Sequence, residues 1–539
     1  MAVMEIIKKS IDDWLNGVDY EHLNSADYLP SEFALTFMNF IKLVNGVEGE
    51  SHKTPPVHLA MLDKIVGPKK LIANLVFRGA AKTTLFAEYL FLFIGVFGYL
   101  PGFGRVEGAL YVADTVDNGA KNLRKSIESR YWASEFLQEW MPPAGVTFTD
   151  AYIEFRNKDG LKFGFKLYGA KSGIRGTKIF AKRPTLCVLD DLLSDEDARS
   201  KTVLETIKST VYKGVFHALD PTRRKIIFNG TPFNKEDPLI EAVESGAWDV
   251  NVWPVCERFP CTEEEFIGAW PDRFTYEFVK DQYDTAVLTG KLPAFNQELM
   301  LRLTSEDERL VQDGEIRWYS RQQLLQNKHN FNFYITTDLA TSEKQKADYS
   351  VISVWAYNAN ADWFWVDGMV ERQTIDKTFN RLFELVQEYK PQQVGVEVSG
   401  QQQAYIKLLE GMMLQRNIWF NFASSDKTGT PGIRPTQDKL ARFNLVVPWF
   451  KTGKIHFPEE IKTSTIIGHF TGQIALATHS GLKGKDDCLD TISMLGYLSP
   501  WKPAESVPPE SLIGHNGGPS MFDEQGPQEA PSALSSYIV

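Results

Sequence analysis

A segment rich in basic and hydroxyl side chains follows an apolar run that ends at residue 77. The run 71–77 is prone to form a strand, and a stretch typical of a helix follows the segment. A strand, a tight loop with a Lys-Thr pair and a helix form the setting in which backbone N–H groups and a lysine bind phosphate. The loop residues are Arg78, Gly79, Ala80, Ala81, Lys82, Thr83 and Thr84. Lys82 would bind the β- and γ-phosphates of a nucleotide, and Thr83 would hold Mg²⁺.

Two positions depart from the usual phosphate-binding pattern, which has glycine at its first place and directly before the lysine. Val76 takes the first place and Ala81 the second. If Ala81 adopts a positive φ, the strain is on the order of 1 kcal/mol, which a folded domain tolerates. Taken alone, the segment is explained equally well as an ordinary turn between a strand and a helix.

Two later apolar runs also end in polar residues. The run 185–190 ends in Asp190 and is followed by Asp191, and the run 225–230 is followed by Thr231. One acid can hold Mg²⁺ and the next can orient the attacking water, while a polar residue at the third strand end can sense the γ-phosphate. A helix cap and a turn are the structural alternatives. Three such strand ends in this order favour ATP hydrolysis.

A second set of acidic residues lies in the C-terminal half. Asp338 and Glu397 each end an apolar run, and Asp486, Asp487 and Asp490 fall in the first turns of an otherwise apolar helix. Acids clustered beside Leu and Ile are costly unless a cation neutralises them. Gathered together, they can hold two divalent ions that activate water and stabilise the leaving oxygen of a phosphodiester. Each acid alone is explained as well by a strand end or a helix cap.

Strands must bring these residues together. The apolar runs predict two series of strands, one in each half of the chain. Between residues 69 and 255 such runs alternate with helical stretches, which predicts a mostly parallel sheet covered on both faces. From residue 331, three β-prone runs, a helix over 375–389 and a run ending in Glu397 follow one another, an order that matches an RNase H-like core. Asp348, in a loop of this region, is a weaker candidate.

The bulk composition excludes several classes of protein. The length of 539 residues predicts two or more domains. The four cysteines are scattered, so neither a disulfide framework nor a zinc site is expected. The N-terminus does not have the pattern of a signal peptide, and the most apolar stretch is too short to span a membrane. The net charge of −11 argues against a protein that coats nucleic acid over its whole surface, although a local basic channel remains compatible.

The ordered set of motifs resembles the large terminase subunit of tailed bacteriophages. The matching segments are FRGAAKTT (77–84), SGIRGTK (172–178), RPTLCVLDD (183–191), FNGTP (228–232), FNQELM (295–300), TTDLA (336–340) with KADYS (346–350), VEVSG (396–400) and KGKDDCLDTISML (483–495). They follow the family order over roughly residues 50–500. The resemblance implies an α/β chain in which a P-loop ATPase domain with a mostly parallel sheet is followed by an RNase H-like nuclease domain.

The resemblance also implies a role for each matching residue. In the ATPase domain, Lys82 and Thr83 would bind phosphate and Mg²⁺, Arg78 would be an arginine finger, and the segment 54–65 takes the place of the part that contacts adenine. Asp190 would be the metal acid, Thr231 the coupling residue, and Asp191 the catalytic acid, where many relatives carry Glu. In the nuclease domain, the metal ligands would be Asp338, Glu397 and Asp487, with Asp486 and Asp490 as further candidates.

The same resemblance implies cofactors, partners and a division of the chain. The cofactors would be ATP with Mg²⁺ at the first site and two Mg²⁺ or Mn²⁺ ions at the second. The partners would be double-stranded viral DNA, the portal protein, the small terminase subunit and identical copies in a ring on the procapsid, in the host cytoplasm and away from membranes. The expected parts are an N-terminal helical segment (1–50), the ATPase domain (51–255), a helical connector (256–330), the nuclease domain (331–501) and a disordered tail (502–539).

Two other functions remain open at this stage. The chain could be a metal-dependent nuclease whose P-loop is degenerate and only structural. It could instead be a non-catalytic assembly protein that uses both domains as docking surfaces. Hydrolysis of ATP that depends on Lys82 excludes the first alternative, and metal-dependent cleavage of DNA excludes the second.

Overall fold

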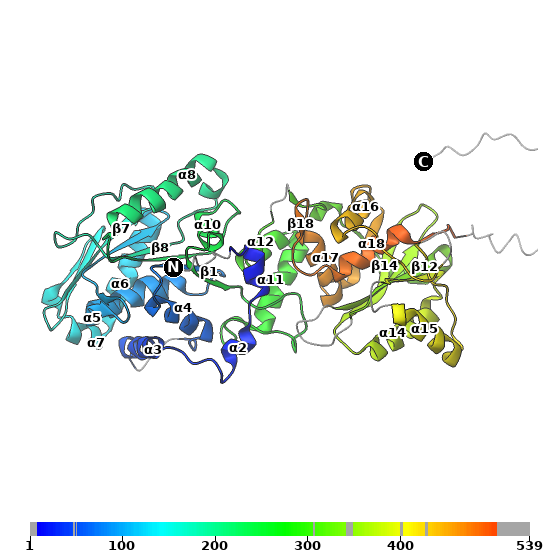
Figure 1. The fold of residues 1–539 in the computed structure, drawn as a ribbon, viewed down its shortest axis with the longest axis horizontal. Helices are drawn as coiled ribbons and strands as arrows, with labels where there is room; N and C mark the ends of the chain where they lie inside the picture. The colour runs from blue at the N-terminus through cyan, green and yellow to red at the C-terminus, as the bar shows by residue number, and fades with distance from the viewer. Residues whose placement is uncertain are drawn as a thin grey trace, which may run out of the picture.

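The molecule consists of two α/β lobes with helices α11 (Tyr276–Thr289) and α12 (Leu292–Glu298) between them (Figure 1). The structure is a computed structural model that describes residues 8–46, 49, 51–304, 308–340, 349–398, 403–425 and 430–503. The candidate Asp348 and the predicted tail from residue 504 onward lie outside the described residues. Within those ranges, no helix combines the length and the apolar character needed to cross a bilayer.

The first lobe contains an eight-stranded sheet. Its strands are β1 (Leu71–Val76), β4 (Gly108–Ala113), β5 (Val146–Phe148), β6 (Tyr152–Arg156), β7 (Lys162–Gly169), β8 (Leu186–Asp190), β9 (Lys225–Gly230) and β10 (Asp249–Trp253). They are arranged in the order β10-β1-β9-β8-β4-β7-β6-β5. The six strands from β10 to β7 are parallel, which confirms the predicted mostly parallel sheet. The antiparallel edge strands β6 and β5 were not predicted, because they are short and half exposed.

Helices surround this sheet and share one core with it. They are α1 (Ile11–Asn16), α2 (Tyr20–Asn24), α3 (Glu32–Asn45), α4 (Pro56–Val66), the π-helical turn Thr84–Tyr89 that leads into α5 (Leu90–Phe97), α6 (Lys121–Ala133), α7 (Glu135–Trp140), α8 (Lys201–Ser209), α9 (Phe216–Ala218) and α10 (Pro238–Glu244). A small hairpin joins β2 (Tyr99–Leu100) to β3 (Gly104–Arg105).

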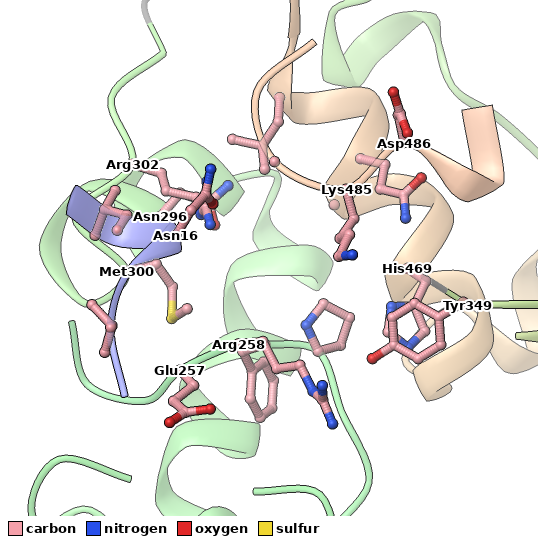
Figure 2. Close-up of a pocket in the computed structure, with 18 of the residues that line it drawn as sticks. Asn16, Glu257, Arg258, Asn296, Met300, Arg302, Tyr349, His469, Lys485 and Asp486 are labelled. Carbon is pink, nitrogen blue, oxygen red and sulfur yellow. The ribbon is translucent and has the colours of Figure 1, made fainter. Parts of the chain in front are cut away.

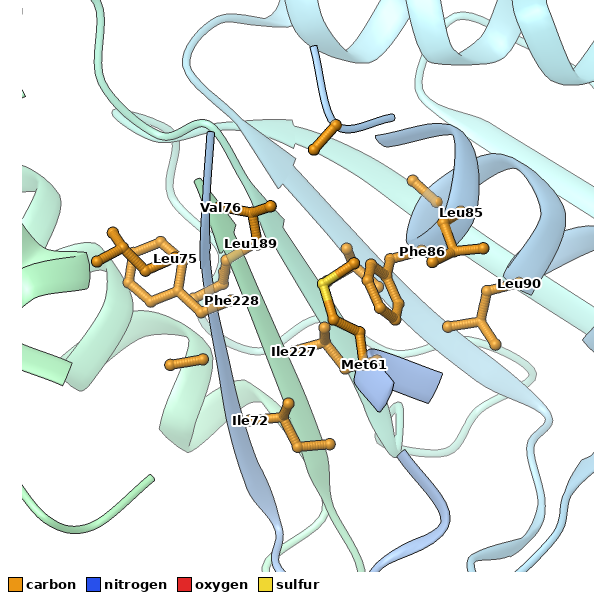
Figure 3. Packing of buried hydrophobic residues seen from close by; sticks show 14 of the residues in the cluster. Met61, Ile72, Leu75, Val76, Leu85, Phe86, Leu90, Leu189, Ile227 and Phe228 are labelled. Carbon is orange, nitrogen blue, oxygen red and sulfur yellow. The ribbon is translucent and has the colours of Figure 1, made fainter. Parts of the chain in front are cut away.

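The central strands of the first sheet carry apolar side chains on both faces. Met61 and Phe86 pack near Ile227, whereas Leu75 and Phe228 lie on the other side of β1 (Figure 3). All five side chains are at most 2% exposed. Fully burying such a side chain contributes roughly 1.5–3 kcal/mol, so the strand ends that carry the polar residues rest on a rigid core.

The second lobe contains a six-stranded sheet in the order β11-β16-β14-β13-β12-β15. Its strands are β11 (Arg317–Tyr319), β12 (Asn332–Asp338), β13 (Ser350–Tyr357), β14 (Trp363–Glu371), β15 (Gln393–Val396) and β16 (Ile455–Pro458). Strands β12, β13 and β14 form an antiparallel series, and β15 pairs with β12 in parallel after a helix. The strand order expected of an RNase H-like core is therefore confirmed.

Helices cover both faces of the second sheet (Figure 1). Helices α14 (Ile375–Tyr389) and α15 (Gln403–Arg416) contribute to one core cluster. Helices α16 (Lys439–Lys451), α17 (Thr465–Leu476) and α18 (Asp487–Ser493) contribute to the cluster on the opposite face. The remaining elements are α13 (Arg321–Gln326) and the short hairpin of β17 (Ala477–Thr478) and β18 (Gly481–Leu482). Helix α17 was not predicted.

The connector packs against both lobes. Its residues up to Leu303 belong to the core of the first lobe, and this core also takes in Ala475 of α17 from the second lobe. The Tyr283 hydroxyl on α11 donates to the Gly468 carbonyl on α17 at 3.0 Å. These contacts tie the helices between the sheets to the face of the second sheet that carries α18.

Candidate active sites

The first site lies where the carboxyl ends of β1, β9 and β8 meet. Lys82 is 6% exposed, and its ammonium donates to the Thr231 hydroxyl at 2.9 Å and to the Val76 carbonyl at 3.4 Å. The Thr83 hydroxyl donates to Asp190 Oδ2 at 2.5 Å. The structure thus brings together four of the residues that the sequence singled out at three separate strand ends.

Asp190 is an acid with almost no access to solvent. Burial, and after it the charge of Asp191, raises the pKa of Asp190 to about 6. The Tyr111 hydroxyl donates to Asp190 Oδ2 at 3.1 Å, and together with Thr83 and Lys82 it opposes this shift. A buried carboxylate of this kind is stabilised by a bound cation. Tyr111 was missed by the sequence analysis, because it is one aromatic residue among the apolar residues of β4.

A ladder of asparagines crosses the sheet and ends beside Asp190. Asn251 on β10 donates to Asn74 on β1 at 2.7 Å, and Asn74 donates to Asn229 on β9 at 2.8 Å. The Asn229 amide lies 3.5 Å from Asp190 Oδ1. All three asparagines are at most 1% exposed. Since buried amides are costly unless they are paired, the ladder fixes the rotamer of Asn229 and with it one side of Asp190.

The loop keeps the backbone conformation that its usual glycine would supply. Ala81 has a φ of 57°, at a strain on the order of 1 kcal/mol. Gly79 has a φ of 87°, and a Cβ added there would lie 3.1 Å from the Phe274 ring. Asp191 has a φ of 42°, and its Oδ1 accepts a hydrogen bond from the Thr231 amide at 3.3 Å. Backbone strain at non-glycine residues gathers at functional sites, and here it lies on two sides of Lys82.

Arg78 is directed to the connector in this structure. Its guanidinium forms an ion pair with Glu298 of α12 at 3.1 Å, and its amide donates to the Glu298 carbonyl at 2.9 Å. The side chain is 72% exposed. Arg78 is therefore attached to the connector through its backbone and its side chain, and the role of an arginine finger stays a prediction. Glu298 lies in the FNQELM motif, but no sequence pattern indicates its contact with Arg78.

A pocket of about 330 Å³ opens next to the loop and is lined in part by Ala81 and Thr84. His58, from the predicted segment 54–65, lies in its wall, and the His58 Nε2 atom is 2.8 Å from the Ala80 carbonyl. Burial lowers the pKa of His58 to about 4, so the imidazole is neutral at pH 7 and donates to that carbonyl. The His58 and Trp270 ring centroids are 4.9 Å apart. The sequence analysis missed Trp270.

The second site lies at one edge of the other sheet. Asp338 ends β12, and Glu397 directly follows β15, whose residue Val396 pairs with Thr337. Asp487 and Asp490 on α18 are 2% and 3% exposed. Burial, and after it the charges of Asp490, Asp487 and Glu397, raises the pKa of Asp338 well above its ordinary value. The predicted acids therefore converge.

Two cations hold part of this acid cluster, and both lie on α16. Arg442 donates to Glu397 Oε2 at 3.0 Å and to Asp490 Oδ1 at 2.9 Å. Lys439 lies 2.8 Å from Asp490 Oδ2 and 2.7 Å from Asp486 Oδ1. The sequence analysis missed both residues, because a Lys and an Arg three positions apart are typical of an exposed helical face.

The two remaining acids, Asp487 and Asp338, differ in how the protein holds them. Asp487 Oδ2 accepts a hydrogen bond from the Tyr349 amide at 3.2 Å. The Asp338 side chain forms no hydrogen bond or ion pair with any described residue, although it lies among three other carboxylates. Asp338 is therefore the acid whose negative charge is least compensated.

The donor chemistry of the cluster suits a hard divalent cation. No three His, Cys, Asp or Glu side chains of the described part of the chain are close enough together to hold a metal ion as they stand. Asp338 nevertheless needs positive charge, and carboxylate oxygens are the ligands that Mg²⁺ and Mn²⁺ prefer. Asp338, Glu397 and Asp487 fit as ligands, although Arg442 holds Glu397 as well as Asp490; Lys439 holds Asp490 and Asp486.

The chain is thus an α/β protein with two separate candidate active sites. One lies on a mostly parallel sheet and suits phosphate, and the other is an acid cluster on an RNase H-like sheet.

No family model and no curated protein matches this chain. Among solved structures, it is similar to the large terminase of bacteriophage HK97, with 14% identity, a TM-score of 0.34, and coverage of 86% of this chain and 98% of that one.

Two further solved structures are similar to single lobes. The Thermus phage P74-26 large terminase ATPase domain shares 13% identity, with a TM-score of 0.30 and coverage of 51% of this chain and 100% of that one. The human cytomegalovirus terminase nuclease domain, soaked with Mn and bound to an inhibitor, shares 18% identity, with a TM-score of 0.28 and coverage of 35% and 94%. The TM-scores of all three structures lie below 0.5.

Proposed function

We propose that this chain is the large terminase subunit of a tailed bacteriophage, a motor subunit that hydrolyses ATP to drive double-stranded DNA into a procapsid and cuts concatemeric DNA. The observation that carries the proposal is the convergence, within one chain, of the Lys82, Thr83 and Asp190 side chains in one lobe and of Asp338, Glu397 and Asp487 in the other. The first set suits a nucleotide triphosphate and the second a phosphodiester.

At the first site, the protein supplies charge and orientation for ATP hydrolysis. Lys82 exchanges the Thr231 hydroxyl and the Val76 carbonyl for phosphate oxygens, and the Thr83 hydroxyl and Asp190 hold Mg²⁺. Asp191 orients the attacking water. The Thr231 amide donates to Asp191, and the Thr231 hydroxyl accepts from Lys82. A movement of Lys82 when the bound nucleotide changes is therefore transmitted to Asp191 through Thr231.

At the second site, the carboxylates bind cations and position the DNA backbone. A pair of Mg²⁺ or Mn²⁺ ions supplies a water of lowered pKa and neutralises the charge that develops on the phosphodiester. Asp338, Glu397 and Asp487 hold the ions. Arg442 donates to Glu397 Oε2 at 3.0 Å and so orients this carboxylate. The same proposal includes the partners and the location of the chain. It would act with the portal protein and the small terminase subunit, in a ring of identical copies on the procapsid in the host cytoplasm.

Separation of the two activities tests the proposal. The full chain and its Lys82→Ala and Asp338→Asn variants are assayed for ATP hydrolysis and for Mn²⁺-dependent cleavage of plasmid DNA. Lys82→Ala should lose ATP hydrolysis by a factor on the order of 10²–10³ and keep cleavage, because removal of one charge-stabilising group has this effect. Asp338→Asn should show the reverse.

Arg317→Ala serves as the matched control, since Arg317 is exposed on β11 away from both sites. ATP hydrolysis that Lys82→Ala leaves unchanged would mean that the P-loop is structural. A wild-type chain with neither activity would be an assembly protein, and the proposal would be wrong.

A further inference from the structure

A pocket of about 500 Å³ lies where the connector meets the second lobe (Figure 2). Its walls come from residues 15–18 of the N-terminal segment, from connector residues between 257 and 302, and from second-lobe residues between 349 and 486. Of the acids of the second site, only Asp486 reaches the lining. The pocket therefore borders the acid cluster at Asp486 and contains none of its other acids, and the N-terminal segment, the connector and the second lobe all contribute to its walls.

Arg302 stands in the wall of this pocket without an ion-pair partner among the described residues. Its guanidinium forms no hydrogen bond or ion pair with another residue of the described chain, and its Nη1 atom is buried. Burial lowers the pKa of Arg302, and only Asp12 opposes this shift. The buried Asn296 side chain, in the same wall, also has an amide nitrogen with no acceptor among the described residues. A buried donor left without an acceptor costs roughly 1–3 kcal/mol.

The rest of the wall is nearly balanced in charge, with Arg258, Arg372 and Lys485 facing the Glu257 and Asp486 carboxylates of the lining. Arg258 and Arg372 share one carboxylate, that of Glu265, at 3.1 and 3.3 Å. Lys485 extends into the pocket from the opposite side to Arg302 (Figure 2). Burial, and then the charges of Arg372 and Arg258, lowers the pKa of His469 to about 3. The histidine is therefore neutral and adds no positive charge. With Glu265 counted, the charge that a bound anion would balance is that of Arg302.

The pocket also offers flat apolar surfaces between its cations. Phe259, Pro260 and Tyr283 line it on the connector side, and the Tyr349 and His469 rings, with centroids 4.8 Å apart, line it on the second-lobe side. Its volume falls within the range of small-molecule sites, roughly 300–1,000 Å³. Cations beside aromatic rings are the surroundings in which a phosphate and a base are held together.

We propose that this pocket binds a nucleotide, with the phosphate on Arg302 and Lys485 and the base against Phe259, Pro260 and His469. An arginine fork matches phosphate oxygens in geometry as well as charge. The nucleotide is either free in solution or the terminal nucleotide of a DNA strand, since both present the same chemistry. This site is distinct from the ATP site and from the acid cluster of the proposed function.

The occupant would touch residues that hold the acid cluster in place. The amide of Tyr349, a lining residue, donates to Asp487 at 3.2 Å. Gln473, also in the lining, accepts hydrogen bonds from the Cys488 and Leu489 amides in the first turn of α18. A nucleotide in the pocket therefore biases the position of Asp487 without contacting it.

The test measures binding in the full chain carrying Lys82→Ala, in the absence of divalent ions, so that neither proposed catalytic site dominates the signal. AMP, ADP and a 5′-phosphorylated trinucleotide are titrated separately by calorimetry. We expect one site, with binding at least tenfold weaker in Arg302→Ala and in Lys485→Ala. Lys485 is exposed, so its variant should fold even if Arg302→Ala does not, and Arg317→Ala is the control that leaves affinity unchanged.

Tighter binding of the trinucleotide than of AMP and ADP would identify a DNA end as the source, and the reverse order would identify a free nucleotide. The inference is wrong if none of the three binds at millimolar concentration, or if binding survives both substitutions. Because ATP hydrolysis and DNA cleavage are measured separately on the wild-type chain, failure of the proposed function would be seen independently.

Discussion

The two candidate active sites hold their acids in opposite ways. In the first lobe a single buried carboxylate, that of Asp190, accepts hydrogen bonds from two hydroxyls and lies near one ammonium. In the second lobe a group of acids faces Arg442 and Lys439, and Asp338 has no partner among the described residues.

This difference in how the acids are held implies that the two sites depend on a cation to different degrees. Hydroxyls orient a carboxylate without neutralising it, so the protein alone already assembles the first site. Repulsion between carboxylates is relieved by protonation, as the raised pKa of Asp338 shows, or by positive charge, which alone lets all of them stay ionised. The second site therefore depends on protein cations for its shape and on added ions for its completion.

Removal of Arg442 should have the largest effect on stability. Arg442→Ala leaves Glu397 and the buried Asp490 without their shared partner, and loss of one member of a buried ion pair typically costs about 3–5 kcal/mol. The free energy of unfolding, measured by urea denaturation, reports this loss. Arg317→Ala should change it by less than about 0.5 kcal/mol. A loss below about 1 kcal/mol for Arg442→Ala would show that the acids do not rely on this cation.

Asp190→Asn should separate activity from stability at the first site. ATP hydrolysis should fall by a factor on the order of 10²–10³, the effect of removing one charge-stabilising group. The unliganded protein should be as stable as the wild type or more so, because burial disfavours the Asp190 carboxylate and Asn still accepts from Thr83. Asp159→Asn, in an exposed turn, is the control. A marked loss of stability in Asp190→Asn would show that the buried Asp190 carboxylate does not destabilise the unliganded protein.

Mn²⁺ should stabilise the second lobe in particular. At a concentration of 100 times the Kd, a ligand that binds only the folded state adds about 2.7 kcal/mol. Calorimetric unfolding should show this gain in stability for the wild type and for Asp190→Asn. The gain should be mostly absent in Asp338→Asn. Equal gains in all three proteins would mean that the ion binds elsewhere.

Ala81→Gly should have the smallest effect. Glycine adopts the φ of 57° without strain, so the first lobe should gain up to about 1 kcal/mol. Ala87→Gly, in the buried helical turn after the loop, is the matched control and should lose about 1 kcal/mol or more. A loss in both variants would show that Ala81 contributes packing that outweighs its backbone strain.

The sequence predicted the parts of each site that sit at strand ends. Lys82, Asp190 and Thr231 follow apolar runs, and parallel strands bring their carboxyl ends to one edge, so pattern alone places them together. The same holds for Asp338 and Glu397, which end neighbouring strands.

The missed residues act across elements whose packing no local pattern reveals. Arg442 lies on an amphipathic helix, where a cation normally faces solvent, and only the docking of α16 against α18 turns it towards Asp490. The asparagine ladder depends on the register of three strands, which a single strand does not encode. Strands β5 and β6 were missed because half-exposed edge strands of three to five residues resemble loops.

The double attachment of Arg78 to Glu298 has a mechanical consequence. A main-chain hydrogen bond and an ion pair join the P-loop to α12. A displacement of the loop must therefore break these two contacts or move the helix with it. The chain that continues from that helix reaches Arg302 four residues later. A movement of the loop at the proposed nucleotide site would therefore be transmitted through α12 to Arg302, in the pocket between the connector and the second lobe.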